Sequence, residues 1–113
     1  MQFMLLIYGG DGSNSPQSEI EAVMAAHIKL SQDLAEAAVV VNGSRLKPSD
    51  TARTVRRKGD DRAIHDGPFP ETREQLGGYY LIEVADMDAA LAWAAKVPLF
   101  EGGGVEVRPL WAM

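Results

Sequence analysis

The sequence contains no cysteine among its 113 residues. This absence excludes disulfide bonds, thiolate metal sites and cysteine nucleophiles. A protein without disulfides suits a reducing compartment, so we expect it in the cytoplasm. Basic residues are also few, because 11 Lys and Arg stand against 16 Asp and Glu, for a net charge of -5. That balance argues against a nucleic-acid partner, and the short basic run at 53–58 is interpreted as a solvated hairpin tip.

Long hydrophobic runs and common cofactor motifs are missing as well. The apolar stretch "MQFMLLIYGG" at residues 1–10 is too short to cross a membrane and has no basic region before it, so it predicts a strand. The glycine runs "GGDG" and "GGG" lack the spacing of dinucleotide or phosphate loops, and no GxSxG occurs. We therefore expect no cofactor and no membrane association.

The patterns that are present predict a single α+β domain over residues 1–113. Apolar residues recur at helical spacing from 16 to about 38, and a second helix starts at Asp86 or Asp88 and stops before Pro98. Strands are expected at 2–8, at 39–48 with a break at Asn42-Gly43, at 76–84 and at 105–111. Residues 53–66 are interpreted as a β-hairpin around the polar turn "KGDD".

Without that inserted hairpin the order is β-α-β followed by β-α-β, which is the ferredoxin-like arrangement. The first strand is apolar on both of its faces, with Phe3 and Leu5 on one and Met4 and Leu6 on the other. Two helices cover only one face of such a sheet. We therefore expect a homodimer in which a second sheet covers the other face.

Two residues are candidates for catalysis. His27 lies seven residues after Ile20 and seven before Leu34, within the apolar stripe of the first helix. Histidines in such a stripe are more often core residues than catalysts, but a carboxylate partner would tune the imidazole for proton transfer. Asp66 begins "DGPFP", which is ordinary turn chemistry. Phe69, between two prolines, is expected to anchor this loop on the core and so to fix Asp66.

Other residues receive weaker assignments. Tyr8, Arg45, Phe69 and Tyr80 are candidate substrate-binding residues. Arg45 could steer an anionic substrate, although a surface ion pair is the commoner role of such a residue. His65 should point away from Asp66 by strand alternation, and a His27–Asp66–His65 metal site has no recognised ligand spacing. Thr72 with Gln75 resembles a capping box.

Several segments together resemble a known family. The block "HDGPFPETREQLGGYYLIEVADMDAALAWAAKVP" and the terminal "GGGVEVRPLW" closely resemble the YCII-related proteins of the DGPF branch, as do "AHIKLSQDL", "SRLKP" and "TARTVRR" upstream. The resemblance implies a dimeric α+β barrel of ferredoxin-like subunits. It also implies an active-site pair made of a first-helix histidine and the aspartate of the DGPF motif, here His27 and Asp66.

Two functions follow as hypotheses. In the first, the protein is a cofactor-independent enzyme of the lyase or isomerase type, in which His27 moves a proton on a small, aromatic or hydroxylated molecule. In the second, it is a non-catalytic module that binds a metabolite or a partner protein. Family members are often encoded beside extracytoplasmic-function sigma factors, which the resemblance offers as such a partner. The fold alone does not decide between them.

Overall fold

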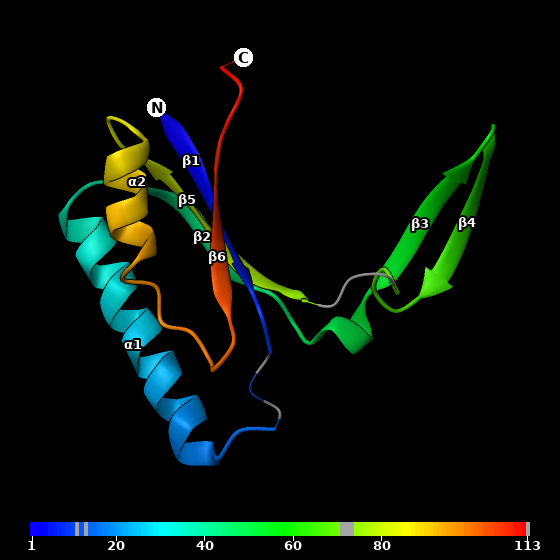
Figure 1. Ribbon diagram of the computed structural model, residues 1–113, viewed down its shortest axis with the longest axis horizontal. Coiled ribbons are helices and arrows are strands. Elements are labelled where there is room, and N and C mark those ends of the chain that lie inside the picture. Colours follow the sequence, from blue (N-terminus) through cyan, green and yellow to red (C-terminus); the bar gives the residue numbers. More distant parts are fainter. Residues whose placement is uncertain (11, 13, 71–73, 113) are drawn as a thin grey trace.

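The computed structural model describes residues 1–10, 12, 14–70 and 74–112. In chain order its elements are β1 (Gln2–Tyr8), α1 (Gln17–Glu36), β2 (Val40–Arg45), β3 (Arg53–Lys58), β4 (Asp61–Asp66), β5 (Leu76–Glu83), α2 (Met87–Ala94) and β6 (Gly104–Pro109), with a short 3-10 turn at Ser49–Thr51. The protein is thus an α+β chain with two helices and two antiparallel sheets over the described residues (Figure 1).

The larger sheet has the strand order β2-β5-β1-β6, and every neighbouring pair in it is antiparallel. Each helix connects two strands that are not neighbours, since α1 runs from β1 to β2 and α2 runs from β5 to β6. This arrangement is compatible with a ferredoxin-like fold. We call the larger sheet and its two helices the body.

Both helices lie on the same side of the larger sheet (Figure 1). The core between them is formed by Phe3, Leu5, Leu30, Leu34, Ile82, Ala90 and Val97, each of which is almost fully buried. Because side chains alternate along a strand, the neighbours of Phe3 and Leu5 point to the opposite face. On β1 and β5 this open sheet face carries Met4, Leu6, Tyr8, Tyr79 and Leu81, all of them half-buried. On β6 it carries Glu106 and Arg108, which form an ion pair.

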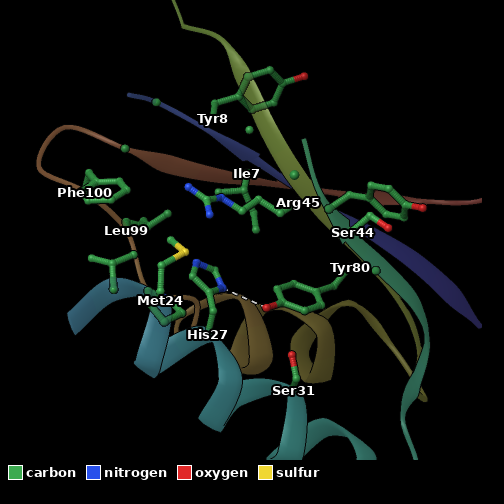
Figure 2. A pocket seen from close by; sticks show the side chains of 18 of the residues that line it. Ile7, Tyr8, Met24, His27, Ser31, Ser44, Arg45, Tyr80, Leu99 and Phe100 are labelled. Carbon is green, nitrogen blue, oxygen red and sulfur yellow. Dashed lines mark hydrogen bonds between the residues drawn. The ribbon is translucent and has the colours of Figure 1, made fainter. Parts of the chain in front are cut away.

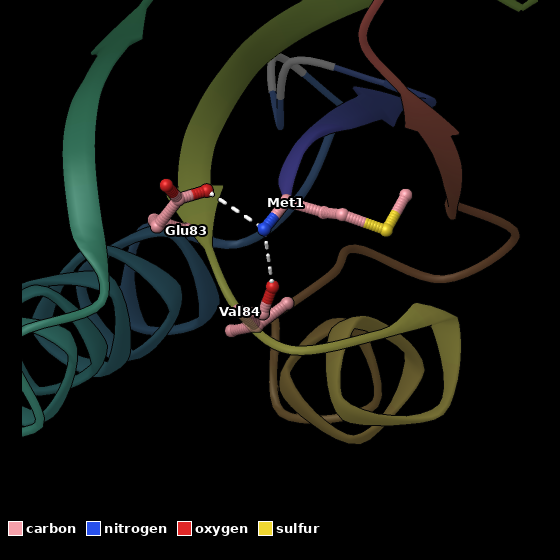
Figure 3. Close-up of polar contacts among 3 residues, drawn as sticks. All are labelled: Met1, Glu83 and Val84. Carbon is pink, nitrogen blue, oxygen red and sulfur yellow. Dashed lines mark hydrogen bonds and ion pairs between the residues drawn. The ribbon is translucent and has the colours of Figure 1, made fainter. Parts of the chain in front are cut away.

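One end of the sheet is closed by the chain's own amino terminus (Figure 3). The ammonium group of Met1 donates to the carbonyl oxygen of Val84 over 2.9 Å and pairs with a carboxylate oxygen of Glu83 at 3.2 Å. Together with the β1–β5 ladder, these contacts fix the register of the two central strands.

Strands β3 and β4 form a separate two-stranded sheet, which we call the arm. The hairpin that the sequence predicts over 53–66 is present with those bounds, and it projects away from the body (Figure 1). Its base is closed by two bonds, from Thr54 Oγ1 to the Gly67 carbonyl and from the Gly67 amide to the Ala52 carbonyl, each 2.7 Å. The arm extends the chain, whose radius of gyration is 15.8 Å, whereas about 13 Å is typical of a compact domain of this length.

The element boundaries follow the sequence closely, except that β2 ends at Arg45 instead of residue 48 and β6 ends at Pro109 instead of residue 111. The expected break at Asn42-Gly43 is wrong, because β2 continues through both residues and its irregularity falls between Val40 and Asn42. Asp86 caps α2 as expected, with its carboxylate accepting from the Ala89 amide over 2.9 Å. The capping box proposed for Thr72 lies outside the described residues.

Candidate active site

A cavity of about 740 Å³ lies between the middle of α1, from Val23 to Ser31, and the sheet. The cavity exists because small residues on the sheet face α1 at this point. Gly78 shares the helix-facing side of β5 with the core residue Ile82, and Gly43 lies opposite Tyr80 on the same side. Glycine provides no side chain to fill the space below α1. The volume falls in the range of sites that bind small molecules.

The absence of a side chain at Gly43 also leaves room for the ring of Tyr80. A Cβ atom at position 43 would come within 2.9 Å of Cδ1 of Tyr80 and 3.1 Å of the Tyr79 carbonyl oxygen. Gly78 is equally constrained, since a Cβ there would meet the Ser44 carbonyl oxygen at 2.8 Å. The two glycines therefore allow β2 and β5 to approach each other while leaving the cavity open.

The principal polar contact of the cavity joins His27 to Tyr80 (Figure 2). Nδ1 of His27 lies 2.9 Å from the hydroxyl oxygen of Tyr80, and the two rings stack with centroids 6.1 Å apart. When Nδ1 carries no proton it accepts from the hydroxyl, and when Nδ1 is protonated it donates to the same oxygen. Either way the hydroxyl holds the imidazole in one orientation.

The surroundings of His27 favour its neutral form. Burial of the ring lowers the pKa of His27 below its ordinary value of 6.5, the backbone carbonyl of Pro98 opposes this shift, and the charge of Arg45 adds to it. A neutral imidazole at neutral pH can accept a proton from a ligand. The guanidinium of Arg45 extends from β2 toward His27 (Figure 2), so the site also offers a positive charge.

The remaining wall of the cavity is mostly apolar. Met24 from α1 and Leu99 and Phe100 from the segment after α2 line one side (Figure 2). Ile7 on β1 lies toward the sheet. A ligand held here would contact hydrocarbon over most of its surface and meet polar groups at only a few points, as is usual for small-molecule sites.

The structure brings together only some of the predicted site residues. Tyr80, Arg45 and His27 meet in the cavity, and Tyr8 lines its far edge with its ring directed away from His27 (Figure 2). Asp66 does not line the cavity: it lies at the base of the arm, with a 93% exposed side chain 3.5 Å from Arg53 Nε. The pairing of His27 with Asp66 is therefore not formed within one described chain and stays a prediction.

The loop that follows Asp66 also differs from expectation. The expected anchoring of Phe69 on the core is wrong, because its side chain is 48% exposed and lies under the guanidinium of Arg56, 4.8 Å from the ring centroid. His65 is exposed on β4, opposite Thr54. The described residues contain no group of three or more histidine and carboxylate side chains that could hold a metal ion.

Sequence reasoning missed the residues that create the cavity. Gly43 was interpreted only as a break in its strand and Gly78 was not singled out, although glycine inside a strand is a known sign of a close backbone approach or of a ligand. Met24, Leu99 and Phe100 were missed for another reason, since ordinary apolar residues carry no separate signal for a cavity wall. The pairing of His27 with Tyr80 depends on the packing of α1 across β5, which no local pattern reports.

Comparison with known proteins places the chain in a family. The model of the YCII-related domain matches residues 1–113. The uncharacterised protein R00369 of Rhizobium meliloti (strain 1021) is 36% identical over 114 residues, which cover 97% of this chain and 92% of that protein. None of the helices formed by the described residues is long and apolar enough to cross a membrane. From the match over its whole length, the chain belongs to the family of YCII-related proteins.

Proposed function

We propose that the cavity binds a small, largely apolar molecule with one anionic group, and that His27 exchanges a proton with it. The observation that carries this proposal is the contact between His27 and Tyr80 in a cavity of about 740 Å³ that Arg45 also lines. The reaction class is cofactor-independent proton transfer, as in a lyase or an isomerase. Its requirements are a positioned base and a site that excludes water.

The electrostatics of the site support an anionic ligand. Arg45 lowers the pKa of His27, so its charge acts at the imidazole. An anion bound at Arg45 would offset that charge and make protonation of His27 easier. Binding of the ligand would thus prepare the imidazole to accept the proton. The anionic group of the ligand, held at Arg45, would orient the reacting carbon toward the imidazole of His27.

A role for Asp66 in this proposal requires a second chain, because within one chain Asp66 stands on the arm and outside the cavity. We propose a homodimer, supported by the half-buried apolar side chains of the open sheet face. In that assembly each copy covers the open sheet face of the other, and the ferredoxin-like subunits carry the hairpin as an insertion. We also propose that the protein belongs to the DGPF branch of its family and works in the cytoplasm.

Phenylpyruvate tests the ligand class, since it combines an aromatic ring, a carboxylate and an acidic C–H beside a carbonyl. Phenylacetone is the matched neutral probe, because it keeps the ring and carbonyl without the carboxylate. We expect phenylpyruvate to raise the melting temperature of the wild type, and Arg45→Gln to weaken that shift. Phenylacetone should give a smaller shift that Arg45→Gln leaves unchanged.

Proton transfer is tested in D₂O by following the C–H signals of phenylpyruvate by NMR. We expect the wild type to accelerate exchange over the uncatalysed rate, His27→Ala to abolish the acceleration, and Tyr80→Phe to reduce it. His65→Ala is the control, since His65 is exposed on the arm. Binding without accelerated exchange would refute the enzyme and identify a ligand-responsive module instead, such as a regulator of a sigma factor.

A further inference from the structure

We propose that the arm is an exchanged element, so that in a homodimer the arm of each copy lies against the body of the other. The inference concerns how two copies hold each other and goes beyond the ligand site. It rests on the exposure of the arm, on the total surface of the chain and on the distribution of charge.

Residues 55–66 of the arm are all exposed in the described chain, and only Thr54 at its base is buried. Its two strands pair with each other and belong to a different sheet from the rest. Val55 and Ile64 lie directly opposite one another, and their side chains are 57% and 70% exposed. An isolated two-stranded hairpin is marginally stable in water. A projecting hairpin with a paired apolar patch at its centre therefore needs a surface to pack on.

The exposed surface area of the chain indicates how much area a partner would bury. The chain exposes 8049 Å² for a mass of 12.2 kDa, whereas a compact monomer of that mass exposes about 6,100 Å². The excess of roughly 2,000 Å² is more than the ~800 Å² per partner of an interface of standard size. Packing of the arm and the open sheet face on a second copy would account for it.

Charge identifies the occupant as a second copy of this chain. Residues 53–66 hold five basic and three acidic side chains, a net charge of +2, so the remainder of the chain carries -7 of the total of -5. On the Val55–Ile64 face, Arg57 lies directly opposite Arg62. Like charges in that position destabilise a hairpin unless an anionic group lies nearby. The body of another copy carries a net charge of -7, and on its open sheet face it presents Glu106, which is paired with Arg108. The same negative charge would repel a nucleic acid.

The body offers a matching apolar surface. Met4, Leu6 and Leu81 lie on the open sheet face, on the side that neither helix covers (Figure 1). Because the same two surfaces occur on both copies, one two-fold axis would satisfy both arms and both bodies at once. The exchange therefore closes at a dimer.

Photo-cross-linking with isotope labels tests the exchange directly. Ile64 is replaced by p-benzoylphenylalanine in chains of natural isotope content, which are mixed with ¹⁵N-labelled wild type, dissociated and reassembled, and then irradiated. We expect products that join the unlabelled arm to a labelled body, detected by mass spectrometry. Dimers that contain only arm-to-body links within one chain would overturn the exchange while leaving the homodimer, and a monomer by light scattering would overturn both. Neither readout needs a ligand, so failure of the ligand proposal stays separate.

A pair of variants supports the same test by measuring dimer dissociation. Val55→Ser with Ile64→Ser removes the apolar patch from side chains that the single chain already exposes, so the monomer should fold. We expect the dissociation constant to rise by about tenfold or more. Ala63→Ser, on the other face of β4, is the matched control and should leave it unchanged. Equal dissociation of all variants and the wild type would overturn the proposal.

Discussion

Helix α1 packs against the same sheet in two different ways along its length. Its carboxy-terminal half buries Leu30 and Leu34 in the core, where they are 4% and 1% exposed. The stretch around Met24 and His27 borders the cavity, which Gly43 and Gly78 also line. We call this stretch the cavity half of α1 and the stretch with Leu30 and Leu34 the core half. The helix keeps one apolar stripe throughout, so the difference arises from the sheet. Small residues on β2 and β5 turn one half of an ordinary helix–sheet contact into a site.

The two halves should therefore differ most in how they respond to truncation. We expect Leu34→Ala to lower the free energy of unfolding by about 2–5 kcal/mol, because it opens a cavity in a filled core. Met24→Ala removes a half-buried side chain that already borders a cavity, and we expect it to cost less than half as much. Urea unfolding at one fixed protein concentration measures both. Equal losses would show that the cavity half is packed as tightly as the core half.

Adding a side chain to the sheet beside the cavity should affect the cavity half of α1. In Gly43→Ala the new methyl group would meet the Tyr80 ring and the Tyr79 carbonyl, so we expect a loss of about 1–3 kcal/mol from overpacking. Displacement of Tyr80 should also weaken the binding of phenylpyruvate. Gly104→Ala is the matched control, because nothing lies within 4 Å of its Cβ position. A Gly43→Ala protein with wild-type stability and binding would refute the assignment of Gly43.

The difference between the two halves of α1 also explains which features the sequence could predict. The strands at 2–8 and 53–66 and the cap at Asp86 follow from local alternation and turn chemistry, and they have the expected bounds. His27 could be named because one histidine interrupts an apolar stripe. Its contact with Tyr80 could not, since it depends on strand register and on which half of α1 lies above glycine.

Asp66 shows the limit of such reasoning in the opposite direction. Its motif predicts an ordered turn, but where a turn points depends on what the hairpin packs against. Within one chain the arm directs Asp66 to solvent beside Arg53. A local motif therefore predicts that a carboxylate is held in place without predicting which imidazole, or which chain, it faces.

The smallest effect is expected from the ionisation of His27, which separates the cavity half from the core half by pH. The folded protein lowers the pKa of His27 from 6.5 through burial, opposed by the Pro98 carbonyl and assisted by Arg45. Between that lowered value and 6.5 the unfolded chain binds more protons than the folded one. Stability should therefore decrease as the pH falls below about 6.5.

Removal of the imidazole isolates this contribution. We expect the wild type to lose more stability than His27→Gln between pH 7.5 and pH 5, measured by urea unfolding at one protein concentration. His65→Gln removes the other histidine, which is exposed on the arm, and should keep the wild-type dependence. If His27→Gln loses as much stability as the wild type over this interval, the imidazole is as free to take up a proton in the folded chain as in the unfolded one. The cavity would then be too wet to hold a neutral base, and the contrast between the two halves of α1 would be one of shape alone.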